Sequence, residues 1–123
     1  MRVSEAVENY LETIYMLSLE KEGVHAADVC ARLSYSRPTV SIMVHQLSND
    51  GYLVIDDDNH LRLTQAGLDI AEPLYERHNL LANMLINLGV STETAYKDAC
   101  KIEHDLSDET YLCIKEHLDK TKP

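Results

Sequence analysis

The chain has 123 residues, of which 45% are hydrophobic and 26% are charged, with four glycines and three prolines. This composition is typical of a folded protein and excludes a chain that is disordered throughout. Asp and Glu number 21 against 11 Lys and Arg, for a formal net charge of −10. Because nucleic-acid-binding proteins are usually basic, DNA binding by this chain requires locally concentrated positive charge or bound cations.

The sequence contains no stretch that approaches the roughly 20 apolar residues needed to span a bilayer. The N-terminus leads directly into an amphipathic pattern, where a signal peptide would have an apolar segment. The three cysteines, Cys30, Cys100 and Cys113, form an odd, widely spaced set without a CxxC pair. We therefore expect no membrane partner, no disulfide framework and a reducing, cytoplasmic location.

The N-terminal half predicts three helices. Apolar residues recur on one face from Ser4 to about Glu22, with Ser4 as the N-cap and Gly23 as the end of the helix. A shorter helix follows over residues 26–33. Pro38 then stands in the first turn of a third helix, where proline is tolerated, and this helix ends at residues 49–51.

Two short strand-like runs come next, residues 52–55 and 60–64, separated by the polar turn 56–59. A helix, a helix–turn–helix and a hairpin in this order are typical of the winged-helix fold. Residues 1–63 are therefore predicted to form a winged-helix DNA-binding domain.

The C-terminal half predicts helices only. Thr64 is expected to cap a long linker helix, which Pro73 should kink or split. Ser91 and Ser107 are plausible caps of two further helices. The fold class is thus mainly α: an N-terminal winged helix–turn–helix with a small β-hairpin, followed by a helical domain over residues 64–123.

The start of the third helix is the predicted DNA-reading surface, because a recognition helix presents its N-terminal residues to base edges and phosphates. Arg37 can bind guanine or phosphate, and Pro38 can contact a thymine methyl group. The alternative is that Ser36 only caps the helix and Pro38 only starts it. The acidic wing tip avoids phosphate unless Arg62 compensates. The predicted DNA-binding residues are Ser36, Arg37, Pro38, Thr39, Ser41, His45 and Gln46.

A thiol, a carboxylate and an imidazole recur within one helical turn at Cys100, Glu103 and His104. At about 100° per residue they share one face, and together they can ligate a transition metal. Taken alone the trio is a weak signal, since a free Cys often packs as a small apolar group.

Two other helices supply candidate partners for this trio. His78 lies on the apolar stripe of its helix and should point inward, where a hydrogen-bonded core histidine is the alternative. Asn9 and Glu12 share a face of the first helix, where a solvated face is the alternative.

The chain resembles the diphtheria-toxin-repressor family of metal-dependent repressors, particularly its short manganese-regulator branch. The resemblance covers nearly the whole chain. The residues that carry it are Glu8–Tyr15, Ser36–Ser41, Asp50–Leu53, Leu63–Gly67, Arg77-His78 and Cys100–Ser107. It implies a winged-helix domain joined to a helical dimerisation domain, with metal bound between the two and operator DNA bound by a homodimer.

The resemblance also implies a ligand set. Glu12, His78, Glu103 and His104 match ligands of the manganese regulators, while Cys100 resembles the cysteine of the iron-dependent repressors. Position 9 departs from both branches, since Asn9 stands where one has Asp and the other Met. Ala82 and Tyr96 replace residues that resemble ligands of a second, ancillary site. The chain ends before the SH3-like third domain of the longer iron regulators.

The predicted function is metal-responsive repression of metal-homeostasis genes. Mn²⁺ and Fe²⁺ are the leading cofactors, and the thiol also admits Zn²⁺ or Co²⁺. One alternative is a winged-helix regulator without a metal response, in which Cys100 is a redox sensor or simply packs. Another is a protein-interaction module, which the net acidity favours. An enzyme is least supported, because we find no nucleophile–base pair, phosphate loop or HExxH motif.

Overall fold

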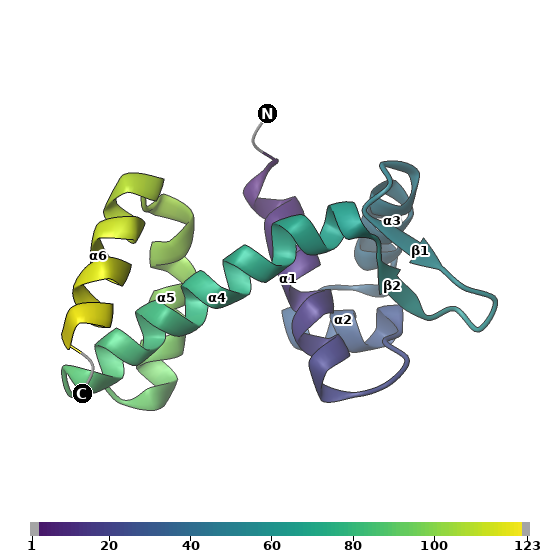
Figure 1. The fold of residues 1–123 in the computed structure, drawn as a ribbon. Coiled ribbons are helices and arrows are strands. Elements are labelled where there is room, and N and C mark those ends of the chain that lie inside the picture. Colours follow the sequence, from purple (N-terminus) through teal and green to yellow (C-terminus); the bar gives the residue numbers. More distant parts are fainter. Residues whose placement is uncertain (1–2, 122–123) are drawn as a thin grey trace. The chain divides into compact units, whose positions relative to one another are not determined.

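The computed structural model of the protein describes residues 3–121. The chain divides into two compact units, residues 1–73 and 74–123. Figure 1 shows the order of the helices and strands along the chain.

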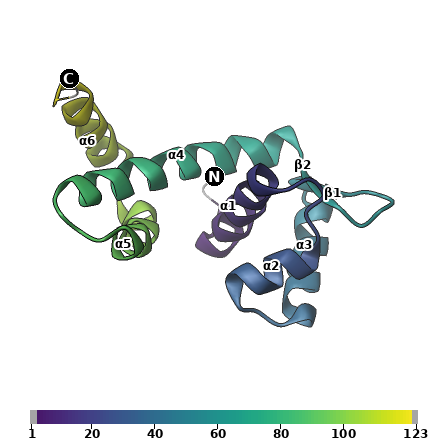
Figure 2. The same cartoon turned by 90° about the horizontal axis from the view of Figure 1, so that it is seen from below.

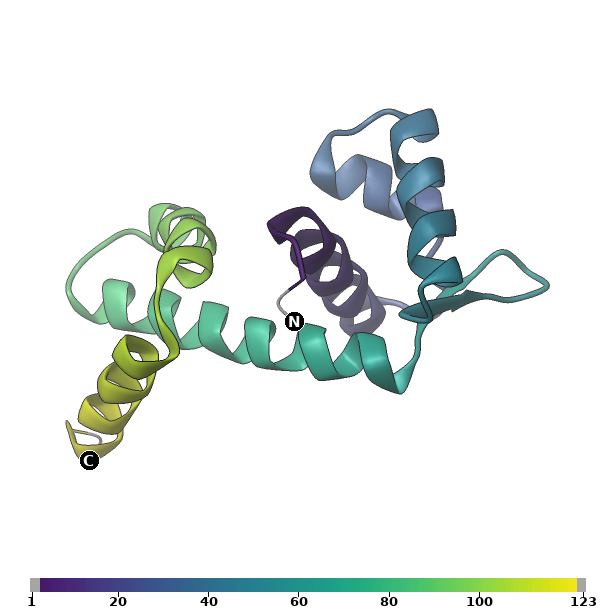
Figure 3. The same ribbon diagram turned by 90° about the horizontal axis from the view of Figure 1, so that it is seen from above.

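The first unit has the predicted winged-helix order. Its elements are α1 (Glu5–Glu20), α2 (Ala26–Leu33), α3 (Arg37–Asn49), β1 (Leu53–Ile55), β2 (Leu61–Leu63) and the start of α4 (Gln65–Asn87). The two strands pair antiparallel, with Leu53 opposite Leu63. In Figure 3, α3 leads directly into this hairpin, as expected of a recognition helix followed by a wing.

Hydrogen-bonded caps confirm three predicted helix starts, whereas Ser91 precedes its helix without a side-chain cap hydrogen bond. The Ser4 hydroxyl accepts a hydrogen bond from the backbone N–H of Val7, and the Ser36 hydroxyl accepts one from Thr39. The Thr64 hydroxyl accepts a hydrogen bond from the N–H of Gly67 at 3.3 Å. Each cap satisfies a donor of the first helical turn that has no partner within its helix.

The first helix ends two residues before the predicted position, which was about Glu22. The helix α1 ends at Glu20, because Lys21 is extended and its N–H bonds to the Leu17 carbonyl. Gly23 lies beyond the helix with φ of +72°, and a Cβ there would approach the His60 ring to 2.7 Å. Its role is to bring the chain close to the wing.

The core of the first unit is aliphatic and lies between α1, α2, α3 and the hairpin. Its most deeply buried members come from each of these elements: Leu11, Ile14, Val29, Val40, Leu47 and Leu53, each at most 1% exposed. Burial of these side chains positions α3 with its first turn facing solvent.

The second unit consists of the C-terminal part of α4, α5 (Thr92–Asp105) and α6 (Asp108–Thr121), as Figure 2 shows. Its small core centres on Leu81, Ala82 and Ala99. Of the two outcomes expected at Pro73, a kink or a split, the split is wrong, because α4 continues through this residue. Across the described residues, no helix combines the length and apolar character that crossing a bilayer requires.

Candidate metal centre

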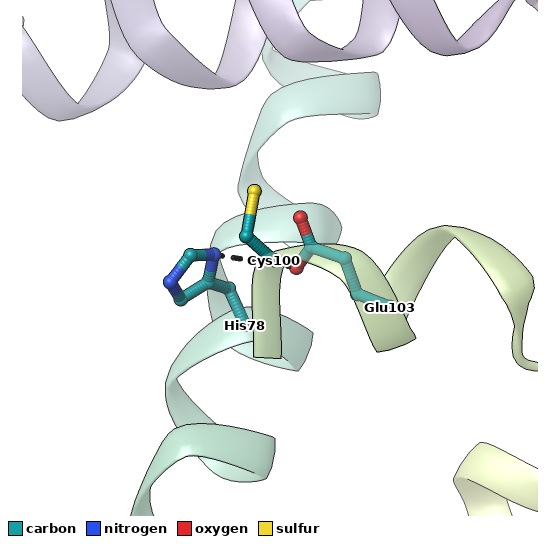
Figure 4. Close-up of side chains that lie close together, drawn as sticks. All are labelled: His78, Cys100 and Glu103. Carbon is teal, nitrogen blue, oxygen red and sulfur yellow. Dashed lines mark ion pairs between the residues drawn. The ribbon is translucent and has the colours of Figure 1, made fainter. Parts of the chain in front are cut away.

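Three different kinds of metal ligand converge in the second unit. His78 projects from α4, and Cys100 and Glu103 project from α5. One candidate ligand atom from each side chain lies within 4.8 Å of the others, and Figure 4 shows the three side chains pointing toward one another. The spacing of Cys100 and Glu103 by three residues puts both on the face of α5 that meets His78.

The carboxylate of Glu103 lies between two imidazoles. Its Oε2 is 3.6 Å from His78 Nδ1, and its Oε1 is 3.5 Å from His104 Nε2. The His78 ring also packs against the ring of Tyr96, with the ring centroids 5.6 Å apart. Ring packing of this kind restricts how His78 can turn.

This cluster is buried, so the negative charge of its carboxylate needs a nearby positive charge. Glu103 is 1% exposed and His78 is 7% exposed. Withdrawing a carboxylate from water is costly unless positive charge compensates it nearby. Either protonated imidazoles or a bound cation can supply that charge.

The donor set fits a divalent transition metal. Imidazole nitrogen, thiolate sulfur and carboxylate oxygen are ligands of such ions at about 2.0–2.3 Å, so atoms sharing one ion lie roughly 3–4.5 Å apart. The 3.6 Å between His78 and Glu103 falls in that range.

The other three predicted ligands, His104, Asn9 and Glu12, lie on α5 and α1. His104 lies beside Glu103 in the second unit. Asn9 and Glu12 lie three residues apart on α1 in the first unit, where Asn9 is half-buried and Glu12 is 4% exposed, so the alternative of a solvated face is wrong for Glu12. The structure thus brings together His78, Cys100, Glu103 and His104, and the contribution of Asn9 and Glu12 remains a prediction.

The predicted DNA-reading residues are all exposed on or next to α3. The Ser36 and Thr39 hydroxyls lie 2.8 Å apart, and His45 Nδ1 lies 2.7 Å from the Ser41 carbonyl oxygen. Arg37 extends from the first residue of the helix. All seven residues are thus accessible to a ligand such as DNA.

Arg62 is held by the wing itself. Its Nε donates a hydrogen bond to Asp56 at 3.0 Å, and Asp56 also accepts hydrogen bonds from the N–H groups of His60 and Asp58. These interactions, the His60 N–H first, lower the pKa of Asp56 to about 2. The guanidinium therefore neutralises an acidic wing residue.

Sequence reasoning assigned no role to Arg77, which stands beside His78 and contacts both α5 and α6. The available signal was an arginine adjacent to a candidate ligand. Its partners lie 26 and 31 residues away, and spacing along the chain does not reveal them.

These features define a class of protein: a winged helix–turn–helix DNA-binding regulator whose helical unit carries a candidate metal centre. Two family models match, the iron dependent repressor N-terminal DNA binding domain over residues 2–61 and the iron dependent repressor metal binding and dimerisation domain over residues 64–122. The chain belongs to the iron-dependent repressor family. This family consists of DNA-binding transcriptional regulators and not of enzymes.

Relatives include both manganese and iron regulators. The chain is 40% identical over 102 residues to the transcriptional regulator MntR of Geobacillus kaustophilus, covering 83% of this chain and 72% of that protein. It is 37% identical over 108 residues to the iron-dependent repressor IdeR of Mycobacterium tuberculosis, covering 85% of this chain and 46% of that protein.

Solved structures agree with the fold. The manganese regulator SloR matches with a TM-score of 0.78 and 29% identity, over 97% of this chain and 55% of that one. The metal-dependent regulator MtsR matches with a TM-score of 0.82 and 28% identity, over 92% and 53% of the two chains. The chain spans about half the length of these two structures.

Proposed function

We propose that this chain is a metal-activated transcriptional repressor that binds operator DNA as a homodimer in the cytoplasm and controls metal-homeostasis genes. The observation that carries the proposal is the convergence of His78, Cys100 and Glu103 in a chain that also has an exposed recognition helix. Residues 1–63 would bind DNA, and residues 64–123 would link, bind metal and dimerise.

The proposed metal ligands are His78, Cys100, Glu103 and His104, completed by Glu12 and Asn9. Support for the last two comes from their spacing on α1 and from the family resemblance at Glu12. Mn²⁺ and Fe²⁺ are the proposed cofactors, in line with the named relatives, MntR and IdeR. The Cys100 thiolate extends the range to Zn²⁺ and Co²⁺, because sulfur favours softer ions.

The proposed DNA contacts come from α3. Arg37 would bind guanine or phosphate, Pro38 a thymine methyl group, and the hydroxyls of Ser36, Thr39 and Ser41 the phosphates. His45 and Gln46 would reach the backbone further along. Exposure of all seven residues supports this assignment.

When bound, the cation supplies positive charge at a buried carboxylate. The ligands of that cation come from α1, α4 and α5, so metal binding would restrain the first unit relative to the second unit. Two recognition helices of a homodimer bind half-sites about 34 Å apart, or a multiple of that distance. Restraining the units raises the population of the DNA-binding arrangement. Charge compensation also eases the approach of a chain with net charge −10 to phosphate.

The test uses the full chain and a duplex selected from a random-sequence pool in the presence of Mn²⁺. We expect chelation of Mn²⁺ to weaken binding at least tenfold by fluorescence anisotropy. Glu103→Gln should bind weakly with or without Mn²⁺. Arg37→Ala should lose about 1–3 kcal/mol of binding free energy while its Mn²⁺ affinity stays unchanged.

Two results would contradict the proposal. Equal affinity in Mn²⁺ and in chelator would indicate a winged-helix regulator without a metal response. Failure to bind any duplex in a salt-dependent manner would indicate a protein-interaction module.

A further inference from the structure

Arg77 joins three helices of the second unit at one point. From α4, its Nη1 donates a hydrogen bond to the backbone carbonyl of Glu103 on α5 at 3.3 Å. Its Nη2 donates to Asp108 on α6 at 2.9 Å, and its Cζ lies 4.4 Å from the centroid of the Tyr111 ring. The Arg77 side chain is 15% exposed, so the guanidinium is largely enclosed by these partners.

Consecutive residues of α4 thus contact the same residue of α5. Arg77 binds the backbone of Glu103, and His78 faces its carboxylate at 3.6 Å. Glu103 stands in the last turn of α5, which ends at Asp105. Carbonyl groups in the last turn have no partner within their helix and carry partial negative charge, so a cation bound there is favourable.

The guanidinium is well suited to this position. Its planar fork can donate in two directions at once while one face lies on an aromatic ring, and a lysine ammonium lacks that geometry. Asp108 is 91% exposed, so its ion pair with Arg77 is worth little by itself. The Tyr111 ring and the Glu103 carbonyl therefore define where the guanidinium lies.

We propose that Arg77 is a positioning residue of the metal centre. It holds the last turn of α5 against α4, so that the Glu103 carboxylate meets His78 before any metal arrives. This inference rests on the proposed function, because it assumes that Glu103 and His78 are metal ligands. Groups that orient ligands from outside the coordination sphere typically change metal affinity 10–100-fold when removed.

The experiment titrates the metal-free full chain with Co²⁺, whose visible and thiolate charge-transfer absorption reports ligand geometry. Arg77→Met removes the donors, and Arg77→Lys retains the charge without the fork. Lys115→Met is the matched control, because Lys115 pairs with Glu76 between α6 and α4 at 3.5 Å. The ¹³C shift of the Glu103 carbonyl in metal-free protein gives a readout that needs no metal.

Both Arg77 variants should bind Co²⁺ at least tenfold more weakly, with an altered charge-transfer band and a shifted Glu103 carbonyl resonance. Lys115→Met should match the wild type. Unchanged Co²⁺ affinity and spectrum in a folded Arg77 variant would overturn the inference. So would a weakening that simply follows lost helix content in both Arg77 variants.

Failure of the proposed function has a different signature. If the wild-type chain binds no Co²⁺, or if Glu103→Gln binds it as well as the wild type, the metal centre itself is refuted. The positioning role then falls with it. Wild-type binding that is lost in Glu103→Gln but retained in both Arg77 variants refutes Arg77 alone.

Discussion

The two units of the chain differ in the size of their buried apolar core. The first unit encloses a large aliphatic cluster that includes Leu11, Ile14 and Leu47. Ion pairs of this unit, such as Lys21 with Asp28 and Arg62 with Asp56, lie where water can reach at least one partner. Its folding therefore depends mainly on apolar burial, although α1 also buries one carboxylate, that of Glu12, which is 4% exposed.

The second unit has a smaller apolar core, around Leu81, Ala82 and Ala99. It buries Glu103 and His78 beside that core. Burying such a carboxylate lowers the free energy of unfolding, and the buried carboxylate is available as a metal ligand. The comparison indicates that a large apolar core stabilises the first unit, while the second unit combines a smaller apolar core with the candidate ligands His78 and Glu103.

The largest expected effect on stability comes from Leu47→Ala in the first unit. Leu47 is fully buried, and leucine-to-alanine changes in protein cores cost about 2–5 kcal/mol. Urea unfolding should show this loss in the metal-free protein. Under conditions where the variant remains folded, its Mn²⁺ affinity should stay within about twofold of the wild type. A large loss of Mn²⁺ affinity in folded Leu47→Ala would show that core packing in the first unit determines metal binding, which contradicts the comparison.

Glu103→Gln should show the opposite pattern. We expect its Mn²⁺ affinity to fall at least 100-fold by isothermal titration calorimetry, about 2.7 kcal/mol. Stability without metal should be unchanged or higher, because a buried carboxylate becomes a neutral amide. The matched control is Glu93→Gln on the same helix, where the Glu93 side chain is 84% exposed. A Glu103→Gln variant that unfolds without metal would indicate a structural carboxylate.

Gly67→Ala tests how tightly the first unit is packed. A Cβ at this position would lie 2.2 Å from the Tyr52 carbonyl oxygen and 3.3 Å from Leu63. Alanine favours helices over glycine by about 1 kcal/mol, yet overlap with a backbone atom should dominate and cost about 1–3 kcal/mol net. Ala66→Ser, at the neighbouring exposed position, should change stability by less than about 0.5 kcal/mol. A stabilised Gly67→Ala variant would show that the backbone at Tyr52 moves away to accommodate the added methyl group.

The elements that sequence predicted well are those with local signals. Ser4, Ser36 and Thr64 are hydroxyl caps that act within three residues, and Pro38 fits only a first turn. Pro73 shows the limit of such signals. It removes one backbone donor from α4, but the surrounding helix continues and the local loss does not split it.

The candidate site was only partly predictable. Spacing alone put Cys100, Glu103 and His104 on one face, and the apolar stripe of α4 indicated that His78 points inward. That these two faces meet is a tertiary fact, which only the family resemblance suggested. The contacts of Arg77 with Glu103 and Tyr111 could not be predicted, because they depend on how three helices pack.

The smallest effect is expected at the wing, where Asp56 is held ionised by the His60 N–H, Arg62 and the Asp58 N–H, with a pKa of about 2. In the unfolded chain an aspartate titrates near pH 3.9. Since the folded pKa is the lower one, the stabilisation is complete above about pH 4 and is lost as the pH falls toward 2. Between these limits, the difference in urea midpoint between wild type and Asp56→Asn should shrink.

The matched control for the wing is Asp57→Asn, because Asp57 is exposed in the same turn. At pH 5 the urea midpoint of Asp57→Asn should lie closer to that of the wild type than the midpoint of Asp56→Asn does. NMR signals of the His60 and Asp58 amides should move with Asp56 protonation in the wild type and remain still in Asp56→Asn. If both aspartate variants gave the same pH profile, acid sensitivity would arise elsewhere in the chain. Ionisation of Asp56 would then not stabilise the wing, and the stability of the first unit would depend on charges outside the wing.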